Sequence, residues 1–584
     1  TPTFDRLARE GILFESAIAP APITLPSHAS ILTGVYPSAH GVRDNGIFAL
    51  APDAVLVSEV LSRHGWRSAA FVGSYVLDAS FGLDQGFEVF RGVPSFAGQW
   101  NAGHYPDRPA SAVVDDAVAW LETLEPGERF FAWLHFFDPH VPHEAPEYWA
   151  KRVAHPYDAE IAFCDDQLRR LLRFLDERGL ADGLLVAVTA DHGEAFGEHG
   201  EESHGVFVYQ ATLRVPLVLS GTPLAHAAGT RVREPVSIAS LAPTLLALAG
   251  LPAEELPDVR VAPLLGPQGG VRTAEPEDAI YLESYLPYHT FRWRALRGLV
   301  WGGYKLVDGQ RPELYALGSD PTEQRDLADA NADVVDDMRR RLAALLDTHA
   351  PLPWAAGHEP DAAARARLEA LGYLAGSAGD DPFAADLPDP RDRIEALEAF
   401  SAAANAIQAY RRAKADGGTA TAWQRAERRE KARARLEGAE QALERARARD
   451  PGNPAIAAQL ATLYGRLGKP EAALALLDEA VRARPRSAQF RQLRAQTYRS
   501  LGRAEDAVNE MQVVVSLDPK FQPAYQWFVG YYSEQGDFGR AVGWASRQLE
   551  TLDEGSPAHA ASAQRLERLS AQMRESGQRL VAPG

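Results

Sequence analysis

The sequence predicts an α/β domain followed by an all-α repeat region. Apolar runs at residues 130–136 and 184–190 have the composition of buried parallel strands, and helical patterns such as residues 157–178 lie between them. From about residue 392 helical periodicity continues without strand-like runs, and segments of 34 residues resemble one another. Strands that alternate with helices favour a doubly wound sheet, whereas the carboxy-terminal pattern favours a separate helical fold.

Length and composition limit the class of protein. A chain of 584 residues is too long for a single core, so two or three domains are expected. The formal charge of −19 argues against general nucleic-acid binding, and no apolar run is long enough to span a membrane. The single cysteine, Cys164, excludes an intramolecular disulfide framework.

Changes in pattern along the chain predict four segments. Residues 1–278 form the main α/β domain, and residues 279–374 add short strands and a helix to it. Residues 375–391 are rich in glycine, aspartate and proline and are predicted to be a linker. Residues 392–584 are helical, with clear repeats from about residue 451. Because the linker is polar, the parts on either side of it are predicted to fold separately.

Four kinds of position recur every 34 residues in the carboxy-terminal segment. They are Pro451, Pro485 and Pro519; Tyr464, Tyr498 and Tyr532; Gly468, Gly502 and Gly536; and Ala473, Ala507 and Ala541. This pattern resembles the tetratricopeptide repeat. The resemblance implies helix pairs stacked into a solenoid, since one pair cannot bury its apolar face alone. It also implies a protein or peptide partner bound through the repeats.

The motif DHGE at residues 191–194 directly follows the strand-like run 184–190. Ligands bind at the carboxyl edge of open α/β sheets, and Asp191 and His192 offer oxygen and nitrogen ligands to Zn²⁺ or Mn²⁺ there. On these two residues alone, an aspartate N-cap beside a surface histidine is the alternative. A second motif far upstream, TLPSHASILTG at residues 24–34, favours the metal site.

The two motifs together resemble those of the sulfatase-like branch of the alkaline phosphatase superfamily, and the resemblance extends from residue 1 to about residue 373. It implies an alkaline-phosphatase-like α/β/α sandwich with a small carboxy-terminal sheet. It also implies a metal-dependent ester hydrolase in the periplasm or another extracytoplasmic compartment. In this family a strand ending in an acidic metal-binding pair precedes the first helix. We therefore expect the sequence to be truncated at its amino terminus, lacking one or two carboxylate ligands and any signal peptide.

Thr24 occupies the position at which sulfatases have a cysteine or serine that is oxidised to formylglycine. Threonine cannot undergo that conversion, so no formylglycine is expected. Threonine here resembles the phosphodiesterase and phosphoethanolamine-transferase members, in which the hydroxyl is both metal ligand and nucleophile. A divalent cation lowers the pKa of such an alcohol, and a helix N-terminus offers donors to an incoming anion. A plain N-cap in front of Pro26 is the alternative.

The resemblance also implies roles for further residues. Asp191 and His192 would hold a divalent metal together with Thr24, with Zn²⁺, Mn²⁺ and Ca²⁺ as the candidates. His28 replaces the arginine of the first motif, and His140 matches the histidine of a D-P-H-x-P motif. Both histidines are therefore expected to bind the substrate anion.

His204 lies where many sulfatases have a lysine and the threonine-dependent transferases have a histidine. An imidazole can donate to a phosphoryl oxygen or protonate a leaving group near neutral pH, so His204 is expected to be a general acid or a substrate ligand. His143 lies where the family usually has an aromatic residue. Its role is open between a binding residue and part of a rigid, proline-rich loop.

These features predict a metal-dependent hydrolase of small anionic esters, either sulfates or phosphates and phosphonates, joined to a repeat module for protein interaction. Thr24 in the nucleophile position favours phosphoryl chemistry. Two alternatives stay open, namely a catalytically inactive interaction protein and a phosphoethanolamine-type transferase. Stoichiometric metal in the purified protein would argue against the inactive alternative.

Overall fold

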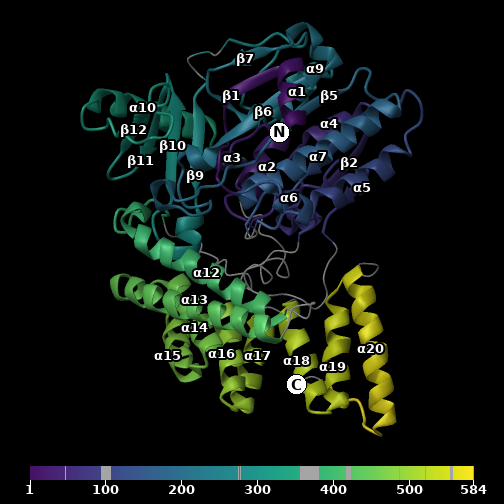
Figure 1. Cartoon of the computed structure of the whole chain (residues 1–584), viewed down its shortest axis with the longest axis vertical. Coiled ribbons are helices and arrows are strands. Elements are labelled where there is room, and N and C mark those ends of the chain that lie inside the picture. The colour runs from purple at the N-terminus through teal and green to yellow at the C-terminus, as the bar shows by residue number, and fades with distance from the viewer. Residues whose placement is uncertain are drawn as a thin grey trace.

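The computed structural model describes the chain except for residues 46–47, 94–106, 142, 274, 276–277, 356–380, 416–421, 486, 518, 520, 553–556 and 583–584. An α/β part contains the amino-terminal half of the chain, and a row of helices contains the carboxy-terminal third (Figure 1). Among the described residues, no helix combines the length and the apolar character needed to cross a membrane.

The strands of the main α/β domain form two sheets. Their bounds are β1 (Ile12–Ile18), β2 (Arg67–Val72), β3 (Val89–Arg91), β4 (Phe130–His135), β5 (Leu185–Thr189), β6 (Arg214–Gly221), β7 (Thr230–Val232) and β8 (Val236–Ser237). One sheet has the order β5-β6-β1-β7, with β8 also paired to β1, and the other has the order β3-β2-β4. The second sheet is parallel throughout.

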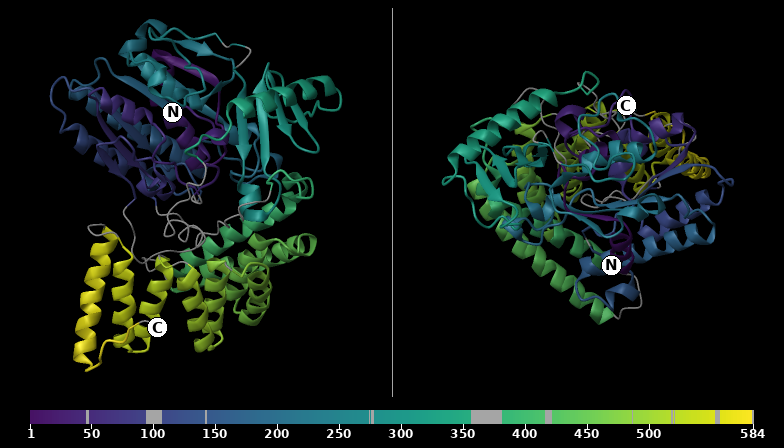
Figure 2. Two further views of the ribbon diagram at one scale, coloured as in Figure 1. Left: turned by 180° about the vertical axis from the view of Figure 1, so that it is seen from behind. Right: turned by 90° about the horizontal axis from the view of Figure 1, so that it is seen from above.

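Helices cover both faces of the parallel sheet, which gives the predicted α/β/α layers (Figures 1 and 2). α5 (Ala110–Leu121) and α7 (Pro156–Glu177) pack against one face, where Phe71 of β2 points. α2 (Thr24–Thr33), α4 (Val57–Arg63) and α9 (Leu241–Leu248) share a core with Val72 on the opposite face. Side chains alternate along a strand, so β2 contributes to both layers. Shorter helices in this domain are α1 (Pro2–Glu10), α3 (Pro37–His40), α6 (Glu147–Ala150) and α8 (Gln210–Leu213).

Strand β5 differs from its prediction as a buried parallel strand. It pairs antiparallel with β6, at the edge of the five-stranded sheet, and its residues are half-buried or exposed. The chain reverses direction between β5 and β6. An uninterrupted apolar run indicates burial but carries no information about the direction of the neighbouring strand.

The predicted small sheet follows the main domain. It consists of β9 (Ile280–Ser284), β10 (Leu296–Trp301), β11 (Tyr304–Asp308) and β12 (Glu313–Ala316), paired antiparallel in chain order. α10 (Ala332–Thr348) covers it through a core that includes Leu299, Leu306 and Met338. A segment of π-helical backbone, η7 (Pro287–Phe291), lies between β9 and β10.

The described residues of the carboxy-terminal region form a series of helices, as predicted. Its helices are α12 (Ile394–Ala415), α13 (Ala422–Arg449), α14 (Pro454–Leu467), α15 (Pro470–Ala483), α16 (Ala488–Ser500), α17 (Ala504–Leu517), α18 (Gln522–Glu534), α19 (Phe538–Glu550) and α20 (Pro557–Glu575). Gly468, Gly502 and Gly536 follow the first helix of each predicted pair and have φ angles of 76°, 74° and 71°. This left-handed conformation favours glycine at a helix end, which explains the recurring position.

The helical region packs directly on the α/β part, although the polar linker predicts separate folding. One core cluster contains Phe291 and Trp293 from the α/β part together with Ala396 and Ile456 from the helices. The rings of Phe291 and Trp293 stack at 4.3 Å, and Phe400 meets Phe291 edge-on at 5.1 Å. The composition of a linker indicates how flexible that segment is, but it does not indicate whether the parts on either side pack against each other.

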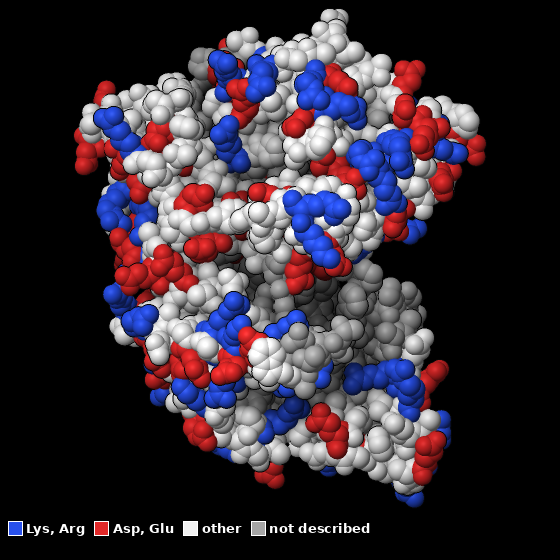
Figure 3. All heavy atoms as spheres, in the orientation of Figure 1, with Lys and Arg blue, Asp and Glu red and all other residues white. Residues whose placement is uncertain are grey.

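Charged side chains of both signs are interspersed over the face of the molecule shown in Figure 3. Lys and Arg lie close to Asp and Glu over the α/β part and over the helices of that face. That face therefore offers no broad basic surface for nucleic acid.

Candidate active site

Four of the predicted site residues come from two elements that meet at one edge of the α/β domain. Thr24 is the first residue of α2, after the extended Ile23, and His28 lies one turn further on. Asp191 and His192 directly follow β5. Thr24 and His28 are buried because α2 packs with most of its length in the interior, and Asp191 and His192 are half-buried.

The hydroxyl of Thr24 contacts the imidazole of His192. Thr24 Oγ1 lies 3.2 Å from His192 Nε2, and His192 Nδ1 lies 2.9 Å from the carbonyl oxygen of Gly193. A carbonyl only accepts, so Nδ1 carries the proton and Nε2 keeps a lone pair directed at Thr24. Burial lowers the pKa of His192, although the charge of Asp191 opposes this effect. The neutral ring can therefore accept the proton of Thr24 or bind a metal ion.

Asp191 lies between two imidazoles. Its Oδ2 is 3.4 Å from His192 Nε2 and 3.6 Å from His28 Nε2, and it is buried without a hydrogen-bond partner among the described residues. Burial raises the pKa of Asp191, but the electrostatic effects of His192, His28 and His135 are larger in sum and lower it. The net pKa lies below the usual range of an aspartate. Ser27 Oγ donates to the main-chain oxygen of Asp191 at 2.6 Å and holds this turn in place.

These spacings fit a bound divalent metal. Ligand atoms about 2.0–2.1 Å from a tetrahedral Zn²⁺ lie about 3.3 Å from one another. The separations from His192 Nε2 to Thr24 Oγ1 and to Asp191 Oδ2 are close to this value. An anionic oxygen buried without a donor is costly unless a cation or proton meets it, so the residues present fit a metal ion.

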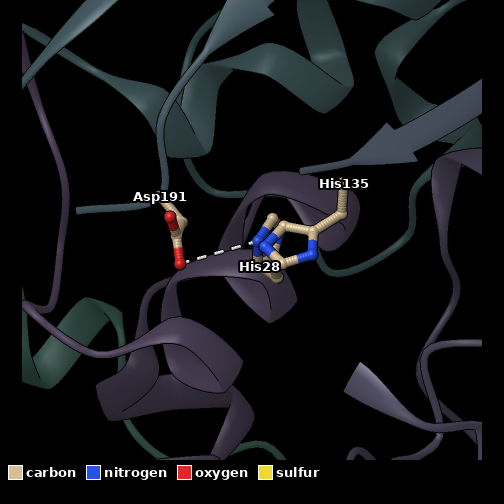
Figure 4. Close-up of side chains that lie close together, drawn as sticks. All are labelled: His28, His135 and Asp191. Carbon is tan, nitrogen blue, oxygen red and sulfur yellow. Dashed lines mark ion pairs between the residues drawn. The ribbon is translucent and has the colours of Figure 1, made fainter. Parts of the chain in front are cut away.

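His135 is a site residue that the sequence-based prediction missed. His28, His135 and Asp191 offer ligand atoms within 4.8 Å of one another, and their side chains converge in Figure 4. The main-chain N–H of Gly73 donates to His135 Nδ1 at 3.3 Å, which leaves the proton of the neutral ring on Nε2. His135 is thus better suited to donate to an anionic oxygen than to bind a metal. Its place at the end of β4 was the available indication.

His204 lies beside His192. The two ring centroids are 4.1 Å apart, and His204 Nδ1 is 3.3 Å from Glu194 Oε1. Burial alone would lower the pKa of His204, but the charge and hydrogen bond of Glu194 raise it above the usual value. Burial raises the pKa of Glu194, but the charge and hydrogen bond of His204 lower it by more, to about 2. The pair therefore favours a protonated imidazole, and Glu194 is a second residue that the prediction missed.

His140 and His143 have different surroundings. His140 lies 5.1 Å from His204 between ring centroids, and its Nδ1 donates to the carbonyl oxygen of Val141 at 2.7 Å. Burial lowers the pKa of His140 to about 3, so the ring is neutral. His143 Nδ1 instead faces Glu160 Oε2 at 2.9 Å. The structure thus brings His140 into the site, whereas His143 joins a contact with α7.

Known proteins are similar to both parts of the chain. A family model described as Sulfatase matches residues 1–251, and models described as Tetratricopeptide repeat match residues 431–497 and 488–521. The chain is 26% identical to a sulfatase of Formosa agariphila, covering 43% of this chain and 65% of that protein. It is 28% identical to the steryl-sulfatase of Mus musculus, covering 50% of this chain and 65% of that protein. The chain thus spans slightly less than two thirds of the length of either relative.

Solved structures share the fold at low sequence identity. A phosphonate monoester hydrolase of Agrobacterium radiobacter has a TM-score of 0.50 and 20% identity, covering 60% of this chain and 91% of that one. The structure of Ps i-CgsB has the same TM-score and identity, covering 60% of this chain and 88% of that one. Residues 1–251 thus match the Sulfatase family model, two carboxy-terminal segments match tetratricopeptide-repeat models, and the α/β part shares its fold with these solved structures.

Proposed function

We propose that this protein is a metal-dependent ester hydrolase in which Thr24 is the nucleophile and phosphate or phosphonate esters are the preferred substrates. The observation that carries the proposal is the 3.2 Å contact between Thr24 Oγ1 and His192 Nε2, beside the unpartnered Oδ2 of Asp191. A nucleophile within reach of an oriented imidazole and a buried carboxylate is the arrangement that activates an alcohol.

Asp191, His192 and Thr24 would hold the metal ion. When bound, it would lower the pKa of the Thr24 hydroxyl and neutralise charge on the substrate. The remaining polar side chains face the same space from the other elements. His135 Nε2–H would donate to one oxygen of the anion, and His28 and His140 would contact the others. Preorganised donors around the transferred group supply most of the rate in such a displacement.

The reaction then has two displacements at phosphorus. In the first, the Thr24 hydroxyl loses its proton to solvent, Oγ1 forms a bond to phosphorus, the ester bond breaks, and protonated His204 gives its proton to the leaving oxygen. In the second, neutral His204 takes a proton from the water that attacks phosphorus. The bond to Thr24 Oγ1 then breaks, and Oγ1 takes a proton from solvent to restore the hydroxyl. Glu194 keeps His204 protonated for the first displacement through the raised pKa of the imidazole.

The preference for phosphorus over sulfur rests on Thr24 itself. A formylglycine hydrate releases sulfate by collapse of a hemiacetal, a route that threonine does not have. The fold alone does not choose between the two reactions, because it is shared with a phosphonate monoester hydrolase and with sulfatases. The repeats add a surface suited to a protein or peptide partner.

Paired substrates test the reaction class. The full chain is assayed with an aryl phosphodiester, an aryl phosphonate and an aryl sulfate that share one leaving group. We expect both phosphorus esters to be favoured over the sulfate by at least about tenfold in kcat/KM. Thr24→Ala should lose at least about 10³-fold of this activity, whereas Thr24→Ser should keep part of it.

Thr33 provides a matched control in the same helix. Its buried hydroxyl donates to the carbonyl oxygen of Ala29 at 2.6 Å, at the far end of α2 from Thr24. Thr33→Ala should therefore keep the activity of the unmodified protein. Preference for the sulfate, combined with full activity of Thr24→Ala, would overturn both the nucleophile and the substrate class.

A further inference from the structure

A short buried segment, residues 43–45, connects the nucleophile helix to the small sheet. We call it the bracket segment. Arg43 Nη1 donates to Glu283 Oε2 of β9 at 2.7 Å, and Asp44 Oδ2 accepts from His289 Nδ1 of η7 at 2.9 Å. Asn45 Oδ1 accepts the main-chain N–H of Leu25 at 2.8 Å. Three consecutive side chains thus contact three different elements.

The contact at Leu25 bears directly on Thr24. The first amides of a helix have no partner within the helix, so their direction depends on groups outside it. Asn45 binds the amide that follows Thr24 and fixes the plane of the peptide bond between Thr24 and Leu25. Threonine is β-branched and stiff at χ1, so fixing its backbone also directs Oγ1 toward His192.

The segment η7, which contacts the bracket segment through His289, also contacts the repeats. Phe291, the last residue of η7, offers its carbonyl oxygen to Asn453 Nδ2 at 3.0 Å in a buried contact. Asn453 also caps α14, because its Oδ1 accepts the amide hydrogens of Ala455 and Ile456. Trp293 Nε1 donates to Asp450 Oδ2 at 2.8 Å nearby. The start of a repeat helix therefore holds the segment that carries His289.

The side chains that make this series of contacts are buried. Asp44 is fully buried, and Asn45, His289 and Asn453 are at most 6% exposed. A buried polar group that loses its partner pays the full cost of desolvation, so each contact constrains the next. Water does not replace these partners easily, in contrast to an exposed network.

We propose that Asp44 and His289 are positioning residues that hold Asn45 and Thr24, and that docking of the repeats at Phe291 holds them in place. The proposal rests on the proposed function, in which Thr24 is the nucleophile. Asp44 and His289 act through the backbone that carries Asn45 and α2, so loss of their contact should lower kcat while substrate binding by the histidines persists.

The first test changes His289. His289→Ala removes the donor to Asp44, whereas His289→Asn places an amide N–H near the position of Nδ1. In the full chain, we expect His289→Ala to lower kcat by about tenfold to a hundredfold with little change in KM. His289→Asn should recover most of kcat. A purely structural role would lower the amount of folded protein without this split between kcat and KM.

A second measurement does not depend on turnover. Amide hydrogen exchange is followed in the peptide covering residues 22–33, which contains the amide of Leu25. We expect faster exchange there in His289→Ala than in the unmodified chain. If the unmodified chain turns over no ester, the proposed function fails, but the exchange result still decides whether the bracket segment holds α2.

The repeat side has its own matched pair. Asn453→Asp keeps the oxygen that caps α14 but replaces the N–H donor to Phe291, so it should lower kcat and speed exchange at Leu25. Ser487→Ala removes the comparable cap of α16 in the next repeat, where Ser487 Oγ accepts from Phe490 N, and should change neither. Unchanged exchange and unchanged kcat in both His289→Ala and Asn453→Asp would overturn the proposal.

Discussion

Thr24 Oγ1 lies 3.2 Å from His192 Nε2, although 168 positions separate the two residues in the chain. The contact exists because the N-terminus of α2 and the loop after β5 meet at the same edge of the domain. The orientation of the His192 ring determines which of its nitrogens faces the hydroxyl. His192 Nδ1 is held by the carbonyl oxygen of Gly193, so only Nε2 is free to face Thr24.

Asp191→Asn should remove most of the metal affinity. The change replaces a charged oxygen ligand by a neutral amide, and the loss of a charged ligand weakens a divalent site by at least about a hundredfold. Metal content of the purified protein, with titration of Zn²⁺ and Mn²⁺ into the stripped protein, measures the effect. Asp165→Asn is the control, because this buried carboxylate accepts the amides of Thr3 and Phe4 at the start of α1. Equal metal content in Asp191→Asn and unmodified protein would contradict the ligand assignment.

His135→Ala should weaken anion binding and leave the metal content unchanged. The reason is the proton on Nε2, which follows from the contact of Nδ1 with the amide of Gly73. Loss of one donor to a charged oxygen should raise the inhibition constant of inorganic phosphate by about tenfold. His143→Ala serves as the control, because that ring faces Glu160. Loss of metal in His135→Ala would show that His135 is a ligand instead.

Glu194→Gln should move the alkaline limb of the pH–rate profile to lower pH. Activity requires protonated His204, so the rate falls as the pH rises through the pKa of this imidazole. Glu194 raises that pKa, and its removal lets burial lower the pKa. The fall in kcat should then begin at a lower pH than in the unmodified protein. A limb at an unchanged pH would mean that another group carries the proton.

A chain ending at residue 380 should be less stable than the whole protein. The cut removes Phe400 and the helices that cover Phe291 and Trp293, so a large apolar surface becomes exposed. Differential scanning calorimetry should show the melting temperature of the α/β part lower by about 5 °C or more. Deletion of α20 alone is the control and should leave that transition in place. Two parts that melt as they do in the whole chain would show that the shared core contributes little.

Local patterns accounted for much of this molecule. The spacing of Pro451, Pro485 and Pro519 predicted the repeats, because each helix pair needs the same turn and packs against its neighbour in the same way. The motifs at residues 24–34 and 191–194 marked the two elements that meet at the candidate site. These patterns are local because helix starts, turns and strand ends depend on residues close together in the chain.

The tertiary structure alone decided the rest. Periodicity shows which face of an element is buried but not what covers it, so it could not show that β5 pairs antiparallel with β6 or that Glu194 reaches His204. Nor could it place His135 beside His28, or Asn453 against Phe291, 162 positions away. The sequence by itself determined the two kinds of domain and the candidate residues Thr24, Asp191 and His192. The distances among them, and the packing of the repeats behind them, depended on contacts between segments far apart in the chain, which are selected only when the whole core forms.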